Sequence, residues 1–253
     1  MRLDNYLFVN KYFDSRTKSK QAIERGEVIV NGLLIDKPSY EINENIAHDI
    51  EIRAKETFVS LGGYKLSKAL KDFSFSVKDK IAIDIGASTG GFTDCLLKNG
   101  TKKVFAVDLN DELLHSTLKN DDRVIPVIKN AKLLNKSDFS VTADIITADL
   151  SFISASIIIP VIKNLLDDKK HLILLIKPQF ENDERIRFKN GIIKNAVYHE
   201  NACKKIFQSA IENGLIPINF TTAPVSDKKN REFLVLCQKN SDIKPFNLDK
   251  YNF

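Results

Sequence analysis

Apolar residues change their spacing along the chain, and each change predicts a different kind of element. Over residues 1–25 they recur at helical intervals, which predicts two short helices. Past residue 27 they alternate, and Asn31 and Gly32 lie between two apolar runs, a strong signal for a β-hairpin. Residues 1–54 are therefore predicted to form a small α+β unit.

From residue 81 onward, short apolar runs alternate with segments of helical periodicity. This pattern predicts a doubly wound α/β domain, in which helices cover both faces of a mostly parallel sheet. The last two strands are expected to form an antiparallel hairpin. The predicted strands are 81–85, 104–107, 124–128, 145–148, 172–176, 216–222 and 232–237, and the predicted helices are 67–73, 92–98, 113–118, 153–166 and 201–213.

These patterns divide the chain into four parts. Residues 1–54 form the small unit, residues 55–61 a linker, residues 62–240 the α/β domain and residues 241–253 a tail. The tail carries Phe246, Tyr251 and Phe253, which leaves open whether it docks on the core or stays loose.

Composition narrows the class of protein. The 253 residues are 43% hydrophobic and 28% charged, as in soluble globular proteins. Three Cys without a CxxC pair, and four scattered His, exclude a disulfide framework and favour no metal site. The longest uncharged apolar run, residues 150–162, is too short to span a bilayer. We expect a cytoplasmic protein without stable membrane insertion.

The formal net charge of +5 is distributed unevenly. Residues 1–25 carry a net +3, residues 26–56 a net −4 and the remainder a net +6. The small unit therefore has a basic half, which suits a polyanionic partner, and an acidic half, which cannot face one. Basic side chains that open a helix can meet phosphates together with the positive end of the helix dipole. The alternative is an ordinary solvated helix face.

A Gly-rich turn follows the first strand of the α/β domain, where doubly wound sheets bind ligands. Its spacing is GxxxGG, and Ser88 occupies the position at which a dinucleotide site needs its second Gly. A ligand without phosphates along the turn, such as S-adenosylmethionine, fits better. Asp108, at the end of the second strand, can accept both ribose hydroxyls. The alternative is that the glycines only shape the turn.

Four polar residues have a pattern that suits methyl transfer to a hydroxyl. They are Lys65, Asp149, Lys177 and Glu232. A ribose hydroxyl is a poor nucleophile until it loses its proton, and a neutral Lys amine can accept that proton. The two carboxylates would orient the amines and the hydroxyl. The alternative is four unrelated surface ions, although Lys177 ends an apolar strand, a costly place for a charge.

Several segments resemble known families. Arg2-Leu3-Asp4, Ser15-Arg16, Gly26-Glu27-Val28 and Val30-Asn31-Gly32 are similar to an S4-type RNA-binding domain. Residues 84–94, 149–153 and 177–181 resemble the TlyA family, FtsJ-like methyltransferases often labelled haemolysins. The resemblance implies a seven-stranded methyltransferase sheet and S-adenosylmethionine-dependent 2′-O-methylation of ribosomal RNA, with cytidine as the target.

The resemblance also implies roles for individual residues. The Lys–Asp–Lys–Glu set corresponds to Lys65, Asp149, Lys177 and Glu232, and no metal is involved. The cofactor residues are Asp84, Gly86, Ala87, Ser88, Thr89, Gly90, Gly91, Phe92, Asp108, Asn130 on the adenine side, and Asp149. The residues that would bind ribosomal RNA, free or in ribosomal subunits, are Arg2, Arg16, Lys18, Lys20 and Gln21.

Other functions remain as hypotheses. A non-catalytic RNA-binding or ribosome-assembly protein would bind RNA without binding S-adenosylmethionine. A membrane-active haemolysin is suggested only by the family label. A small-molecule methyltransferase would leave residues 1–54 without a role.

Overall fold

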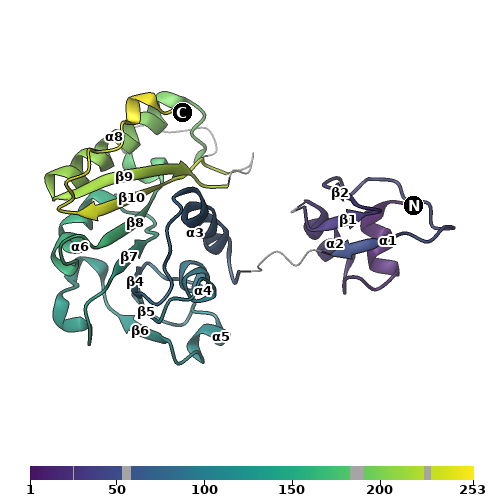
Figure 1. The fold of residues 1–253 in the computed structure, drawn as a ribbon, viewed down its shortest axis with the longest axis horizontal. Coiled ribbons are helices and arrows are strands. Elements are labelled where there is room, and N and C mark those ends of the chain that lie inside the picture. The colour runs from purple at the N-terminus through teal and green to yellow at the C-terminus, as the bar shows by residue number, and fades with distance from the viewer. Residues whose placement is uncertain (25, 53–57, 183–190, 225–228) are drawn as a thin grey trace. The chain divides into compact units, whose positions relative to one another are not determined.

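The computed structural model describes residues 1–24, 26–52, 58–182, 191–224 and 229–253 (Figure 1). The chain divides into two compact units, Met1–Thr57 and Phe58–Phe253. The division falls inside the predicted linker. Its first residues, 55–57, lie outside the described part of the chain, and residues 58–61 belong to the second unit.

The small unit contains two helices and a three-stranded antiparallel sheet in the order β2-β1-β3. The elements are α1 (Leu3–Val9), α2 (Arg16–Glu24), β1 (Val28–Val30), β2 (Leu33–Ile35) and β3 (Ile50–Ile52). Asn31 and Gly32 both have positive φ, 50° and 80°, as the predicted tight hairpin between β1 and β2 requires. Leu3, Leu7 and Ile23 are fully buried, so the helices pack their apolar sides onto the sheet.

The large unit is built on a seven-stranded sheet in the order β6-β5-β4-β7-β8-β10-β9. The strands are β4 (Ile81–Ile85), β5 (Lys103–Asp108), β6 (Val124–Ile128), β7 (Ile145–Ala148), β8 (His171–Ile176), β9 (Leu215–Thr222) and β10 (Phe233–Lys239). The pairings from β6 to β8 are parallel, and β10 is antiparallel to both β8 and β9. The predicted doubly wound sheet with a closing hairpin is confirmed.

Helices cover both faces of this sheet (Figure 1). They are α3 (Leu61–Asp72), α4 (Gly91–Lys98), α5 (Ser116–Lys119), α6 (Ile159–Leu165), α7 (Pro178–Glu181) and α8 (Ala196–Glu212). Successive strand residues point to opposite faces, so Ile83 and Ile85 pack with α6 and α8, whereas Ala82 packs with α3 and α4. Each face therefore has its own apolar core.

Four predicted helices differ at their start. Helix α3 begins at Leu61, so Lys65 lies inside it and not before it. The His115 side chain caps α5, which delays its start to Ser116. Pro160 lies in the first turn of α6, where its missing N–H leaves no helix bond unmade, and a 3₁₀ turn precedes it. The Asn195 side chain accepts the Val197 N–H, which caps α8 earlier than predicted.

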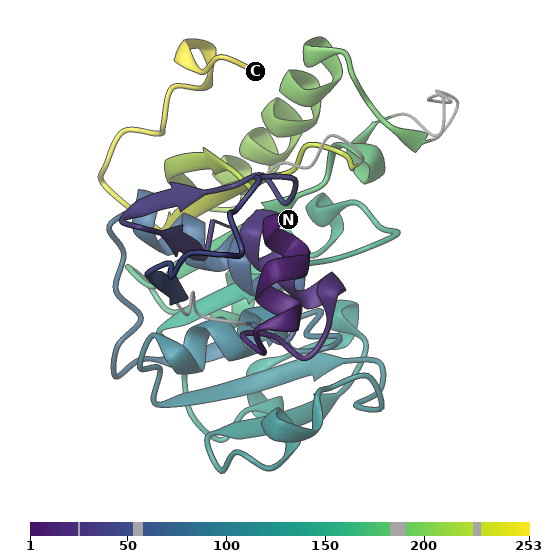
Figure 2. The ribbon, with the colours of Figure 1, turned by 90° about the vertical axis from the view of Figure 1, so that its right-hand side faces the viewer.

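The C-terminal tail docks on the large unit. Phe246, Tyr251 and Phe253 pack against the apolar core, and Phe246 contacts Phe207 of α8. The tail is the yellow trace that ends at the C-terminus in Figure 2. The ring centroids of Tyr251 and Phe220 lie 4.7 Å apart in an edge-to-face arrangement. The tail therefore covers the outermost strand with aromatic side chains.

Strand order reverses between β4 and β7, which are neighbours in the sheet although the strands β5 and β6 lie between them in sequence. In open α/β sheets, ligands bind outside the carboxyl ends of the strands at such a switch point. The residues that follow β4, β7 and β8 are Gly86, Asp149 and Lys177. The fold thus brings the predicted site residues to one edge.

Candidate active site

The Gly-rich turn passes unusually close to the end of β7. Gly86 has φ +81°, and a Cβ built on it would lie 2.5 Å from the backbone oxygen of Asp149. Real side-chain carbons do not approach that closely, so the contact and the left-handed backbone both require glycine. The turn and the strand end therefore form one continuous wall.

Two cavities meet at this wall. The smaller, about 150 Å³, is lined by turn residues, the start of α3 and the ends of β7 and β8. The larger, about 460 Å³, extends toward β5 and β6 and is of the size that holds small molecules. Gly86, Ser88, Asp149 and Ser151 line both. A ligand in the larger cavity could therefore present one end in the smaller.

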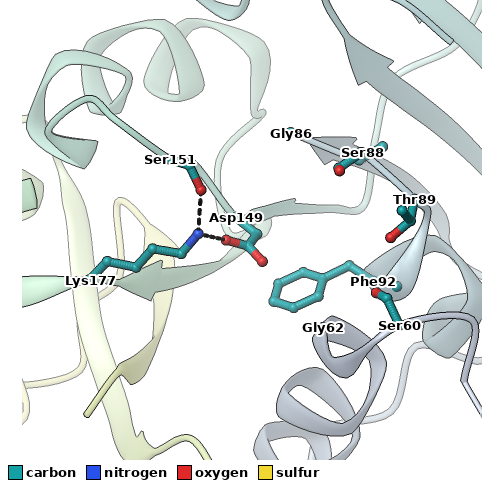
Figure 3. Close-up of a pocket in the computed structure, with 11 residues that line it drawn as sticks. Ser60, Gly62, Gly86, Ser88, Thr89, Phe92, Asp149, Ser151 and Lys177 are labelled. Carbon is teal, nitrogen blue, oxygen red and sulfur yellow. Dashed lines mark hydrogen bonds and ion pairs between the residues drawn. The ribbon is translucent and has the colours of Figure 1, made fainter. Parts of the chain in front are cut away.

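Lys177 and Asp149 form an ion pair in the smaller cavity. The Lys177 Nζ lies 2.6 Å from Asp149 Oδ1 and donates a hydrogen bond of 2.8 Å to Ser151 Oγ. Figure 3 shows this amine and carboxylate facing Phe92 and Thr89 across the cavity. Both side chains are largely buried, so solvent screens their interaction little.

Lys65 and Glu232 form a second ion pair. The Lys65 Nζ lies 2.6 Å from Glu232 Oε2. Phe233 pairs with Ile176 across β10 and β8, so the preceding Glu232 lies at the same sheet edge as Lys177. The smaller cavity is lined by Asp149 and Lys177 and, among the described residues, by neither Lys65 nor Glu232. The structure thus joins the four predicted residues as two pairs.

Asp108 and Asn130 line the larger cavity. The Asp108 carboxylate accepts the Ser88 N–H at 2.8 Å and the Leu109 N–H at 2.7 Å, which fixes its orientation beside the turn. The Asn130 side chain accepts the Lys132 N–H at 3.0 Å. Each oxygen of Asp108 retains a lone pair for a further donor such as a ribose hydroxyl.

Two of the residues predicted to bind the cofactor reach neither cavity. Asp84 is fully buried, and its carboxylate accepts the hydroxyls of Thr93 at 2.7 Å and Thr147 at 2.9 Å. A Cβ on Gly90 would lie 2.2 Å from the Leu118 side chain, which lines neither cavity. Among the residues predicted to bind the cofactor, Asp84 and Gly90 therefore lie behind the turn and line neither cavity.

Asp84 makes stability depend on pH. Burial raises the pKa of Asp84 to about 6, from a usual 3.8, against the lowering effect of its two Thr donors. The folded state therefore holds this proton more tightly, and stability falls as pH rises from about 4 to about 6. In urea unfolding, we expect the stability of the wild type relative to Asp84→Asn to fall by about 3 kcal/mol across this window. A difference that stays constant or rises would contradict the assignment.

Sequence reasoning missed several residues that line the cavities, and three of them carry polar or aromatic groups at the ends of the site. Ser60 lines the smaller one, Ser151 lines both, and Phe152 lines the larger. Phe152 is 88% exposed, has a positive φ of 67° and contacts Phe180 with ring centroids 5.4 Å apart. Its place directly after Asp149, Leu150 and Ser151 was the available signal, since a strand end at a switch point carries its following loop into the site.

The five predicted RNA-binding residues are all exposed on the small unit. Arg2 and Arg16 both bond the Asp4 carboxylate, and Lys18 pairs with Asp14 at 2.6 Å. The Ser15 hydroxyl oxygen accepts the Lys18 N–H at 3.2 Å, which caps the start of α2. Arg25, which adds to the basic count of this unit, lies outside the described residues.

Comparison with known proteins agrees with this geometry. The sequence model of the S4 domain matches residues 1–45, and that of FtsJ-like methyltransferases matches residues 58–240, more than half of the chain. The chain belongs to the FtsJ-like methyltransferases. Its larger unit is therefore an S-adenosylmethionine-dependent methyltransferase domain in fold and family.

Relatives place this methyltransferase in the TlyA family. Hemolysin A of Brachyspira hyodysenteriae is 40% identical over 237 residues, which cover 92% of this chain and 98% of that protein. The 23S rRNA (cytidine-2′-O)-methyltransferase TlyA of Campylobacter jejuni is 33% identical over 233 residues, 81% of this chain and 89% of that protein. A solved hemolysin-like structure from Streptococcus thermophilus covers 97% of this chain and 90% of its own, with a TM-score of 0.69 and 34% identity.

The described residues offer neither a metal-binding cluster nor a membrane-spanning helix. Within the described ranges, no group of three or more His, Cys, Asp or Glu side chains is arranged to hold a metal ion. No helix in the same part of the chain combines the length and the apolar character needed to cross a bilayer.

Proposed function

We propose that this protein transfers a methyl group from S-adenosylmethionine to the 2′-hydroxyl of a ribose in ribosomal RNA, with cytidine as the target nucleotide. The observation that carries the proposal is the ion pair of Lys177 and Asp149 in a cavity beside the Gly-rich turn. This arrangement supplies a buried amine next to the place where a methyl donor would end.

The S4 match and the relatives support the RNA substrate. An S4 domain precedes the methyltransferase domain, and the Campylobacter jejuni relative carries the name of an rRNA cytidine-2′-O-methyltransferase. A small-molecule substrate would leave the exposed basic residues of the small unit without a role. A ribose in ribosomal RNA accounts for both units.

The residues present fit S-adenosylmethionine. The close approach of Gly86 to Asp149 forms a backbone cradle that any side chain would fill. Asp108 and Asn130 offer polar groups in the larger cavity, whose lining also includes apolar side chains such as Leu109 and Phe152. The turn would hold the methionine end, Asp108 the ribose and Asn130 the adenine side. When bound, the cofactor supplies a sulfonium methyl carbon that is already electrophilic.

The chain's own residues would position and deprotonate the hydroxyl. Asp149 and Ser151 hold the Lys177 nitrogen from two sides, so its position in the cavity is fixed. In its amine form, Lys177 would accept the hydroxyl proton while the oxygen takes the methyl group and the methyl–sulfur bond breaks, which leaves a neutral thioether; Lys177 would then release that proton to water. Glu232 holds Lys65 at the same sheet edge, where its positive charge would attract the substrate phosphates.

A methyl-transfer assay tests the proposal. The purified full chain is incubated with methyl-labelled S-adenosylmethionine and ribosomal subunits from a bacterium that lacks this enzyme. We expect label in one 2′-O-methylated cytidine, identified by mass spectrometry of the digested RNA. Label on a base, or no label in either subunit, would contradict the proposal.

Calorimetry with S-adenosylmethionine separates the proposal from a non-catalytic RNA-binding protein. We expect one binding site per chain, because one Gly-rich turn ends at one switch point. Binding of RNA without binding of S-adenosylmethionine would favour the assembly protein. Lysis of red cells by detergent-free protein, retained in Asp149→Ala, would favour the haemolysin.

A further inference from the structure

A buried carboxylate lies beneath two exposed arginines in the small unit. Asp4 is 2% exposed, and its Oδ1 and Oδ2 accept the Nε and Nη2 of Arg2, each at 3.1 Å. The Arg16 Nε donates to the same Oδ2 at 3.1 Å, and the Asn5 N–H donates to Oδ1 at 3.0 Å. One side chain therefore fixes two guanidinium groups that come from the ends of different helices.

The shared oxygen places the two arginines close together. Arg2 Nη2 and Arg16 Nε each lie 3.1 Å from Oδ2, so they are no more than twice that distance apart. The Asp4 carboxylate accepts hydrogen bonds from Nε and Nη2 of Arg2 and from Nε alone of Arg16. In the described part of the chain no other acceptor is bonded to the remaining guanidinium nitrogens. Both arginine side chains are about half exposed.

The carboxylate is charged in this arrangement. Burial acts to raise the pKa of Asp4, but the hydrogen bonds from Arg2 and Arg16 outweigh burial, and the pKa lies below its usual value. A charged Asp4 beneath two guanidinium groups leaves a net positive charge on the exposed side. That side can meet an anion without exposing the carboxylate.

We propose that Asp4 is a positioning residue that holds Arg2 and Arg16 together as a preformed clamp for an RNA phosphate. The inference rests on the proposed function, since it takes ribosomal RNA as the polyanion. Arginine side chains lose much rotamer freedom when they bind, and folding has already fixed these two. The remaining nitrogens of both groups can then bond phosphate oxygens at little further entropic cost.

Charge and positioning predict opposite results for Asp4→Asn. The variant loses one negative charge, which raises the net charge of the basic unit by one, so charge alone predicts tighter RNA binding. Loss of the clamp predicts weaker binding. Asp14→Asn is the matched control, because it adds the same charge to the same unit but removes only an exposed pair with Lys18.

Binding of the full chain to ribosomal subunits, measured at several salt concentrations, distinguishes the effect of charge from the effect of positioning. We expect the Kd of Asp4→Asn to rise about tenfold, the scale of one lost charge-assisted contact, with the salt slope reduced by about 1. Asp14→Asn should bind as tightly as the wild type or more tightly. In methyl transfer, Asp4→Asn should raise KM for subunits and leave kcat unchanged. Asp4→Asn binding as tightly as Asp14→Asn would overturn the inference.

A second variant covers the case in which Asp4→Asn unfolds the small unit, which circular dichroism would report. Arg16→Lys keeps the charge but loses the planar fork that can bond Asp4 and a phosphate together. We expect a similar loss of affinity, and wild-type affinity would overturn the inference. Wild-type protein that binds subunits without methylating them would contradict the proposed function alone, whereas wild-type protein that binds no ribosomal RNA would overturn both.

Discussion

Lys177→Met is expected to lower the rate of methyl transfer about 10³-fold at saturating substrates, the scale of a lost general base. The Lys177 amine lies between Asp149 and Ser151 in the smaller cavity, and methionine has similar length without a nitrogen. The S-adenosylmethionine Kd, measured by calorimetry, should change much less than the rate, because the Gly-rich turn is intact. The rate is measured in single-turnover reactions with ribosomal subunits.

Lys177→Arg distinguishes a proton acceptor from a positive charge. Arginine can keep an ion pair with Asp149, but its guanidinium does not lose a proton at accessible pH. If Lys177 accepts the hydroxyl proton, Lys177→Arg should be nearly as slow as Lys177→Met. A variant with Arg that retains most of the activity would show that position 177 needs charge alone.

The same sheet offers a matched control at its opposite edge. Lys170 and Asp144 precede β8 and β7 and form an ion pair of 2.5 Å, as Lys177 and Asp149 do where these strands end. Lys170→Met removes a corresponding, more exposed pair without touching either cavity, so its activity should stay within about twofold of wild type. Equal losses in Lys170→Met and Lys177→Met would mean that the effect is one of stability.

Strand ends were predictable because they depend on local pattern. An apolar run followed by a polar residue gave Asp149 after β7 and Lys177 after β8, and the parallel sheet brings such ends to one edge. The pairing of the four polar residues was not predictable. It depends on the register of β10 against β8 and on where α3 packs, which are tertiary features.

The start of α3 shows why local propensity was insufficient. Gly62 and Gly63 are weak helix formers, so the pattern placed the helix start after Lys65. In the fold, these glycines let α3 approach α4: a Cβ on Gly91 would lie 2.9 Å from the Gly63 nitrogen. Packing against α4 therefore decides a helix boundary that propensity opposes. Ser60, which lines the smaller cavity, enters the site through the same packing.

Burial explains why Asp84 lines neither cavity. Its position after an apolar strand and before the glycines is the same in sequence as that of a ligand-binding carboxylate. Only the structure shows that Thr93 and Thr147 take both of its oxygens. Asp108 has a similar sequence position, yet it lines the larger cavity. A position at the end of a strand thus predicts that a residue lies at the ligand-binding edge of the sheet, but it does not predict whether the side chain faces the ligand.

Gly86→Ala is expected to weaken S-adenosylmethionine binding by about 100-fold or more. The added Cβ would lie 2.5 Å from the Asp149 backbone oxygen, and φ +81° is strained for alanine by about 1–2 kcal/mol. Because the neighbour is backbone, the turn must move away from β7, and the wall shared by both cavities opens. Affinity is measured by calorimetry on the full chain.

Gly100→Ala separates backbone strain from this close contact. Gly100 has φ +83°, almost the same as Gly86, but its added Cβ would meet the flexible Lys78 side chain at 3.3 Å, and Gly100 lines none of the described cavities. Both variants should lower the melting temperature, whereas only Gly86→Ala should lose cofactor affinity. Equal affinities in the two variants would contradict the assignment of the turn as the cofactor cradle.

Gly86→Ala should also slow methyl transfer when S-adenosylmethionine is present at saturating concentration. The displaced backbone oxygen belongs to Asp149, whose carboxylate holds Lys177 at 2.6 Å. A shift of the turn therefore moves the end of β7 and misaligns the amine relative to the methyl carbon, and small misplacements of reacting groups cost large factors in rate. Single-turnover rates at saturating cofactor would reveal this second effect. A wild-type rate under those conditions would mean that the turn binds the cofactor without positioning the catalytic pair.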